Sequence, residues 1–238
     1  MDEQHNYDII APFYDVEHAP FREDLDMYLN YAELSGGAIL ELACGSGRVL
    51  LPLAREGYMI TGVDSSAHML ALARQQVQHA GLAGHCMLIE QDMRMLQLER
   101  KFRLAFIALG SFAHMTTRKD QQRVLQALRA HLGMGSTCII DISNADARYM
   151  EDLGGHVLHQ GTWRREDGTM LTHFYDQHQQ GGNVQRTVVT THLYLFERGE
   201  MELLLEQAGF AVKEVYGHYD LSPFQLDSPR MIFLAEAR

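Results

Sequence analysis

The chain lacks the features that mark secreted and membrane-spanning proteins. Its only three cysteines, Cys44, Cys86 and Cys138, lie far apart and form no Cys-x-x-Cys pair. We therefore expect neither a disulfide framework nor a cysteine zinc site. No apolar run approaches the roughly 20 residues that span a bilayer, which predicts no membrane association. Residues 1–8 are acidic and polar, unlike a secretory signal, and this start is typical of a cytoplasmic protein.

Positive charge is scarce as well. Only three of the 20 basic residues are lysines. The 31 acidic residues outnumber the basic ones, and the net charge is −11 at pH 7. With no basic run, this balance disfavours nucleic acid as a partner and favours a small-molecule substrate. The 238 residues, 46% of them hydrophobic, suit a single α/β domain with one embellishment. The sequence leaves a monomer and a homodimer equally open.

Predicted strands and helices alternate along most of the chain. Apolar and aromatic residues at helical spacing over 7–14 and 21–34 predict two helices, which form an N-terminal cap over residues 1–35. Apolar runs then predict strands at 38–42, 58–63, 86–90, 104–109, 136–142, 211–216 and 231–235. Helices are predicted between them at 48–56, 67–79, 119–131 (closed by Gly133) and 199–208. This alternation indicates a mostly parallel sheet with helices on both faces.

A β-rich segment from about residue 150 to 197 interrupts this pattern. Turn pairs at Asp167-Gly168 and Gly181-Gly182 separate its runs of β-branched residues, which predicts an antiparallel insertion that acts as a lid over the sheet's active edge. His173, Asp176 and His178 suggest a metal site there. Residues five apart in a strand point to opposite faces, however, so no metal is expected.

The most informative motif follows the first predicted strand, where residues 39–48 read Ile-Leu-Glu-Leu-Ala-Cys-Gly-Ser-Gly-Arg. Gly45 and Gly47 permit positive φ and close approach of a ligand to the backbone. A dinucleotide fingerprint needs a third glycine at position 50, where Leu50 stands, so NAD is disfavoured. Asp64, 19 residues beyond Gly45, lies where a carboxylate accepts hydrogen bonds from ribose hydroxyls. Its alternative role is a helix cap, because Ser65 and Ser66 open the next helix.

Taken together, these motifs resemble the class I S-adenosylmethionine-dependent methyltransferases. The matching segments are the glycine loop, the second-strand end Gly62-Val-Asp-Ser-Ser, Gln91-Asp92-Met93, the strand at 104–109, and Gly209-Phe210. The resemblance implies S-adenosyl-L-methionine as cofactor, S-adenosyl-L-homocysteine as product, and a Rossmann-like seven-stranded sheet whose last strand is antiparallel. It implies that a single domain covers residues 1–238. The cofactor contacts that it implies are Glu41, Ala43, Gly45, Gly47, Asp64, Ser65, Met69, Asp92, Met93 and Leu109.

Two of these implied contacts have simpler alternatives, since Asp92 suits the cap of a turn and Met93 suits the core. Two further segments, from Tyr7 to Asp15 and from Gly110 to His114, are similar to small-molecule methyltransferases, including aminosugar N-methyltransferases. Many of that group have Asn-Ser-Phe where this chain has Gly-Ser-Phe, so the acceptor stays open.

The acceptor is expected at the carboxyl ends of the strands, where ligands collect in parallel sheets. His114 is a candidate general base, with a helix cap as its alternative, and Tyr14 can present its ring to a sulfonium or pack. Candidate acceptor contacts are Ser111, Phe112, Asn144, Tyr175, Tyr219 and Arg230. We predict in-line methyl transfer to nitrogen or oxygen of a small molecule. The alternatives are a non-catalytic cofactor-binding regulatory or scaffold protein, and cofactor-dependent chemistry other than methylation.

Overall fold

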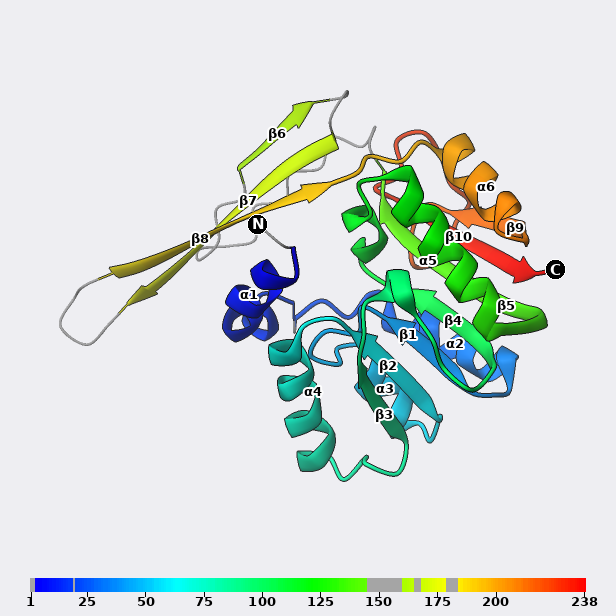
Figure 1. Ribbon diagram of the computed structural model, residues 1–238, viewed down its shortest axis with the longest axis horizontal. Coiled ribbons are helices and arrows are strands. Elements are labelled where there is room, and N and C mark those ends of the chain that lie inside the picture. The colour runs from blue at the N-terminus through cyan, green and yellow to red at the C-terminus, as the bar shows by residue number, and fades with distance from the viewer. Residues whose placement is uncertain (1–2, 19, 145–159, 165–167, 179–183) are drawn as a thin grey trace.

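A computed structural model describes residues 3–18, 20–144, 160–164, 168–178 and 184–238 (Figure 1). Its main element is a seven-stranded sheet in the order β3-β2-β1-β4-β5-β10-β9. The bounds are β1 (Ile39–Leu42), β2 (Ile60–Asp64), β3 (Cys86–Glu90), β4 (Phe102–Ile107), β5 (Leu132–Ser143), β9 (Phe210–Tyr216) and β10 (Arg230–Ala237). β10 runs antiparallel to both of its neighbours, while β1 to β5 pair in parallel. The predicted fold class is confirmed.

The strand order creates the crevice in which a ligand can bind. From β1 the chain moves outward through β2 to β3, and it then returns to place β4 on the other side of β1. Loops that follow β1 and β4 therefore leave the sheet in opposite directions, which opens a crevice at their carboxyl ends. Because β10 is antiparallel, it begins at the same edge, and Arg230 pairs with Ser143 there.

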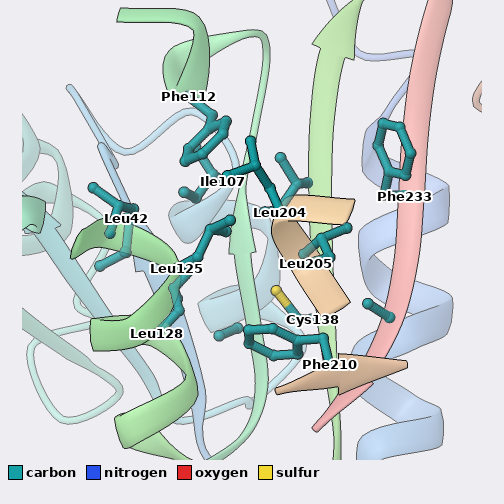
Figure 2. Close-up of a cluster of buried hydrophobic side chains, with 14 of the residues drawn as sticks. Leu42, Ile107, Phe112, Leu125, Leu128, Cys138, Leu204, Leu205, Phe210 and Phe233 are labelled. Atoms are coloured by element: carbon teal, nitrogen blue, oxygen red, sulfur yellow. The ribbon is translucent and has the colours of Figure 1, made fainter. Parts of the chain in front are cut away.

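Helices cover both faces of the sheet and bury an apolar layer on each. Side chains of α2 (Leu25–Ser35), α3 (Leu50–Arg55) and α4 (Ala67–His79) share one buried cluster. On the other face, α5 (Arg118–His131) and α6 (Arg198–Gln207) pack against the strands. Figure 2 shows this second layer, in which Leu125, Leu128, Leu204 and Leu205 meet Leu42, Ile107, Cys138 and Phe233.

The helix bounds follow the predictions where a cap fixes them. α4 has the predicted bounds, and the side chain of Ser66 caps its start by accepting a hydrogen bond from the Met69 N–H. The prediction that Gly133 closes α5 is wrong. Leu132 is already extended, at φ −103° and ψ 140°, and it begins β5 directly. β4 ends two residues earlier than predicted, because Leu109 and Gly110 both have positive φ.

The predicted insertion contains a separate three-stranded antiparallel sheet, which we call the lid sheet: β6 (Gln160–Arg164), β7 (Gly168–His178) and β8 (Val184–Leu193). In Figure 1 it extends away from the main sheet, past α1 (Glu3–His18). Of the turn residues predicted there, Gly168 begins β7, whereas Asp167 and Gly181-Gly182 lie outside the described residues. The described parts contain no group of three His, Cys, Asp or Glu residues placed to hold a metal ion. None of the helices described is both long and apolar enough to cross a membrane.

Candidate functional site

The glycine loop between β1 and α3 bends through three residues with positive φ: Ala43 at 55°, Gly45 at 54° and Gly47 at 93°. A Cβ added at Gly45 would lie 3.2 Å from Cε of Met69 and 3.8 Å from the ring of Tyr14. Met69 is 1% exposed and leaves the loop no room to move away. Glycine at position 45 thus satisfies both the backbone conformation and the close packing of the loop.

Asp64, at the end of β2, joins this loop to the start of α4. Its carboxylate accepts hydrogen bonds from the N–H of Gly45 and from the N–H of Ser66, each at 2.8 Å. Burial raises the pKa of Asp64, against the opposing effect of hydrogen bonds from the backbone of Ser66, Gly45 and Ser65. The helix cap is Ser66 and not Asp64, so the carboxylate fixes the loop and leaves further lone pairs for a ligand.

Glu41 is a buried carboxyl group beneath the glycine loop. It is 3% exposed, and burial raises its pKa well above the ordinary value although Arg48 lowers it. The guanidinium of Arg48 is itself bound by both carboxylate oxygens of Asp24, at 2.7 and 2.6 Å. Among the described residues, Oε2 of Glu41 has no hydrogen-bond partner. A buried acceptor without a partner is costly, so this atom suits a ligand that brings a donor.

Beyond β3, Asp92 and Met93 show both of their simpler roles. Asp92 caps the short helix η1 (Met93–Met95) by accepting a hydrogen bond from the Arg94 N–H at 2.8 Å. Although partial burial raises the pKa of Asp92, hydrogen bonds from Arg94 lower it overall. Met93 packs, partly buried, against the main core. Asp92 nevertheless stays partly exposed at the crevice edge, with a side-chain exposure of 32%.

Helix α1 carries Tyr14, one of the two predicted catalytic residues, and contacts the other, His114 of η2 (Ser111–His114), through Tyr7. Oη of Tyr7 lies 2.7 Å from Nε2 of His114, and the two rings meet edge to face at 5.3 Å. Tyr14 stacks on His18, with ring centroids 4.2 Å apart, beside Gly45. Tyr7 and Tyr14 are two helical turns apart and so share the face of α1 that covers the site.

Two carboxylates on α1 accept hydrogen bonds from serines of the glycine loop and of the start of α4. The Ser66 hydroxyl donates to Asp8 at 2.6 Å, and the Ser46 hydroxyl donates to Asp15 at 2.5 Å. Asp15 also accepts a hydrogen bond from the side chain of Gln76 on α4 at 2.9 Å. Helix α1 is therefore fixed to the glycine loop and to α4 by side chains.

The predicted acceptor contacts do not gather at one place. Phe112 has no exposed surface and stacks on Phe196, with centroids 5.2 Å apart, so an acceptor contact is wrong for this residue. Tyr175 is 3% exposed, stacks on Phe13 and donates to Glu17, which fixes the lid sheet to α1. Both aromatic rings are therefore packed in the protein interior, where large apolar side chains are usually found.

Asn144 and Ser111 lie closer to open space. Asn144 donates through Nδ2 to the carbonyls of Leu226 and Ser228, and it lines a pocket of about 480 Å³ together with Met231 and the start of α6. That volume is in the range of a small-molecule site. Ser111 begins η2 (Ser111–His114), the short helix that follows β4 and ends with His114.

Sequence reasoning missed Asp141 on β5. Its carboxylate accepts hydrogen bonds from the Leu109 N–H and the Tyr219 hydroxyl, each at 2.9 Å, and it pairs with Arg230. Two predicted acceptor contacts, Tyr219 and Arg230, are thus partners of this buried carboxylate. The available signal was a lone acid in the apolar run Cys138-Ile-Ile-Asp-Ile of a buried strand.

Comparisons with known proteins agree with this geometry. Residues 39–135 match the family model described as a methyltransferase domain. The putative methyltransferase YqeM of Bacillus subtilis (strain 168) is 24% identical, over 97% of this chain and 96% of that protein. A dTDP-3-amino-3,4,6-trideoxy-alpha-D-glucopyranose N,N-dimethyltransferase of Streptomyces venezuelae is 23% identical, over 76% of this chain and 78% of its own length.

Among solved structures, an S-adenosylmethionine-dependent methyltransferase from Clostridium acetobutylicum ATCC 824 superposes with a TM-score of 0.81. The match covers 97% of this chain and 98% of that one, at 20% sequence identity. Such low identity shows a shared fold, and the fold is that of the enzyme class that the sequence motifs resemble.

Proposed function

The chain carries a methyltransferase domain, and from that premise we propose that it transfers the methyl group of S-adenosylmethionine to an amine nitrogen of a small molecule. The observation that carries the proposal is the crevice where the glycine loop, Asp64 and the unpartnered oxygen of Glu41 meet the Tyr7–His114 pair. We expect the first group to bind an amino-acid nucleoside, and the Tyr7–His114 pair to take part in proton transfer, at the carboxyl edge of the sheet.

The residues present fit the cofactor's chemistry. S-adenosylmethionine supplies, when bound, a methyl group on a positively charged sulfur. The unpartnered Oε2 of Glu41 is an acceptor for the ammonium at its amino-acid end, which would relieve the buried acceptor. The two oxygens of Asp64 hold the loop and have lone pairs left for ribose hydroxyls. We expect Ala43, Gly45 and Gly47 to line the amino-acid end of the bound cofactor, and Ser65, Met69, Asp92, Met93 and Leu109 to contact its nucleoside or sulfur.

The acceptor must present a lone pair to the methyl group in line with the bond that breaks. We expect His114 to hold or remove the acceptor's proton, with Tyr7 fixing the imidazole through the 2.7 Å contact with Nε2. Tyr14 offers a π face beside the glycine loop to the sulfonium, an interaction of about 0.5–2 kcal/mol. Helix α1 covers the crevice and excludes water, so alignment of the reactants supplies much of the acceleration.

Nitrogen is favoured over oxygen as the acceptor atom by the relative from Streptomyces venezuelae, which acts on an aminosugar nitrogen according to its name. The net charge of −11 is also compatible with an acceptor that carries a protonatable amine. We expect Ser111 and Asn144, and the pocket beside Asn144, to contribute to acceptor binding.

Calorimetry with the purified chain tests cofactor binding. We expect S-adenosylmethionine and S-adenosylhomocysteine to bind with Kd on the order of micromolar. Asp64→Ala removes the group that fixes the loop and faces the ribose, so Kd should rise at least tenfold, on the scale of about 1.4 kcal/mol per decade. Asp26→Ala, an exposed carboxylate on α2, is the control and should bind like the parent chain. Absence of binding by folded protein rules out the proposal.

Release of S-adenosylhomocysteine then tests turnover with a panel of aminosugar nucleotides, simple amines, phenols and carboxylates. We expect product with amines, and His114→Ala should lower turnover at least tenfold, since general bases contribute about 10²–10⁴-fold. Methylation of phenols alone would assign the acceptor to oxygen. Cofactor binding without product on the whole panel would contradict a methyltransferase, and mass spectrometry of the small molecules would reveal any other chemistry.

A further inference from the structure

Asp141 is a fully buried carboxylate that joins segments from four places in the chain. It lies near the end of β5, between β4 and β10 (Figure 1), and has 0% exposure. Its Oδ2 accepts from the N–H of Leu109 and from the hydroxyl of Tyr219, and its Oδ1 pairs with Nε of Arg230 at 2.5 Å. The main-chain carbonyl of Asp141 accepts the N–H of Gly110 at 2.9 Å.

These contacts hold an unusual backbone. Leu109 and Gly110 have φ of 49° and 77°, so two consecutive residues are left-handed, and one of them carries a branched side chain. A non-glycine residue rarely adopts this region unless its surroundings impose it. Asp141 accepts hydrogen bonds from both N–H groups, that of Leu109 on its carboxylate and that of Gly110 on its main-chain carbonyl. The direction in which the chain leaves β4 therefore depends on Asp141.

That direction decides where η2 and His114 lie. Gly110 is the residue that precedes Ser111, the first residue of η2, and η2 ends at His114. A change of the backbone at Leu109 would move this short helix as a unit. The Tyr7–His114 contact lies at the end of η2, so it depends on the same backbone conformation at Leu109 and Gly110.

A second set of contacts links Asp141 to the glycine loop. The guanidinium of Arg230 lies over the ring of Tyr219 at 5.3 Å, and Tyr219 meets the ring of Phe21 edge to face at 5.6 Å. The guanidinium of Arg48, which directly follows Gly47, also lies over the ring of Phe21, at 5.2 Å from its centroid. Ordinary packing and charge contacts thus connect the loop after β4 with the loop after β1.

We propose that Asp141 is a positioning residue, which fixes the loop after β4 and, through Tyr219, its separation from the glycine loop. The two loops lie on opposite sides of the crevice, so Asp141 sets the alignment of acceptor and methyl donor without touching either. The inference rests on the proposed function for its effect on turnover. Its structural part, the hold on Leu109 and Gly110, stands independently of that function.

Three variants test the proposal. Asp141→Asn keeps the shape but removes the charge that pairs with Arg230, and Tyr219→Phe removes one hydrogen bond while keeping the fold's packing. Glu236→Gln is the matched control, because Glu236 lies on the same strand as Arg230 and pairs with Lys213 at the opposite edge of the sheet. For each variant we would measure hydrogen exchange over residues 104–116, the Kd of S-adenosylhomocysteine, the melting temperature, and turnover per cofactor-binding site.

We expect faster exchange at 108–113 in both test variants and not in the control. Turnover should fall about 10²-fold in Asp141→Asn, the scale for a displacement of roughly 1 Å, and less in Tyr219→Phe, while Kd rises by much less than tenfold. A purely structural role would lower the melting temperature but leave turnover per binding site unchanged, and that result overturns the proposal.

If Asp141→Asn does not fold, Tyr219→Phe decides, since exchange and turnover equal to those of the control would overturn the inference. A parent chain without turnover on any acceptor would contradict the proposed function instead. The exchange data would then still decide whether Asp141 holds the loop.

Discussion

Two residues of the site have carboxyl groups whose buried surroundings disfavour the charged form. Burial raises the pKa of both Glu41 and Asp64. Asp64 is compensated by backbone N–H donors, whereas Oε2 of Glu41 has no partner in the described structure. The chain without ligand therefore holds a carboxyl group whose charged form is stabilised only once a donor arrives.

This arrangement predicts how stability depends on pH. The folded state keeps the proton of Glu41 to higher pH than the unfolded chain does, because the pKa of an unfolded glutamate is about 4.3. Its contribution is complete below that value and is lost as pH rises toward the raised pKa. Without cofactor, the melting temperature of Glu41→Gln minus that of the parent should thus be more positive at pH 8 than at pH 5. Glu33→Gln, an exposed change on α2, is the control. An equal difference at both pH values contradicts this account.

The hydrogen bond between Tyr7 and His114 predicts a second effect. Tyr7→Phe keeps the ring contact but leaves Nε2 of the imidazole without its phenol partner. Turnover should fall about tenfold, at the low end of what acid–base groups contribute, with little change in cofactor Kd. Tyr58→Phe, between α3 and β2 at the amino end of the strands, is the matched control. Equal turnover in the two variants would limit Tyr7 to packing.

The positions of site residues were predictable from the sequence where a local strand end or turn defines them. Asp64 and the glycines follow directly from a strand end and a turn, so their place in the crevice could be anticipated. Phe112 and Asp141 could not, because the burial of each depends on elements distant in sequence. Phe196 covers Phe112, and Arg230 comes to Asp141 only when β10 pairs with β5.

Among the elements, α4 shows how one residue can serve both a helix and a site. The hydroxyl of Ser66 accepts from the Met69 N–H to cap α4 and donates to Asp8 of α1. Ser66→Ala should therefore reduce stability by about 0.5–2 kcal/mol and also weaken cofactor binding, because α1 loses a contact at the crevice.

Thr117→Ala supplies the comparison for this prediction. Thr117 caps α5 by accepting from the Asp120 N–H, far from the glycine loop. Denaturant unfolding should show a similar stability loss in both variants, while calorimetry should show weaker cofactor binding in Ser66→Ala alone. Equal cofactor binding by the two variants would show that Ser66 stabilises the helix without contributing to the site.

Elements with their own start and stop signals were predictable within a few residues. Strand β3 and helix α4 have their predicted bounds, since apolar runs and the Ser66 cap define them locally. β5 is longer than predicted because Leu132 pairs with Phe102 of β4 ahead of the apolar run. The three-stranded lid sheet was expected as an antiparallel insertion, but its contact with α1 through Phe13 and Tyr175 had no local signal.

For the whole molecule, α1 connects the lid sheet to the glycine loop and to the start of α4. Asn6 donates to the carbonyl of Thr190 on β8 at 2.8 Å, and Phe13 stacks on Tyr175 of β7 at 4.5 Å. The same helix binds Ser46 and Ser66 through Asp15 and Asp8. Order gained at the glycine loop should therefore be passed to the lid sheet.

Hydrogen exchange with S-adenosylhomocysteine measures this coupling. We expect ligand to slow exchange in β8 as well as in the glycine loop. Phe13→Ala should reduce the effect in β8 and keep it in the loop, because the stacked contact with Tyr175 is lost while that of Asn6 with Thr190 remains. Val16→Ala on the same helix, at a side chain 78% exposed, is the control. Slowing of exchange in β8 of Phe13→Ala as large as in the control would show that the lid sheet responds by another route.

The contacts of α1 also bear on how the protein is made. Asn6 and its partner Thr190 are 184 residues apart, and Tyr7 and His114 are 107 apart. At about 5–20 residues per second, synthesis takes roughly 10–40 s to supply the last partner of a helix made near the beginning. During that time the apolar face of α1, with Ile10, Phe13 and Tyr14, has no lid sheet to pack against. The apolar face of α1 thus stays uncovered until β8 emerges, and the contacts of α1 are completed only then.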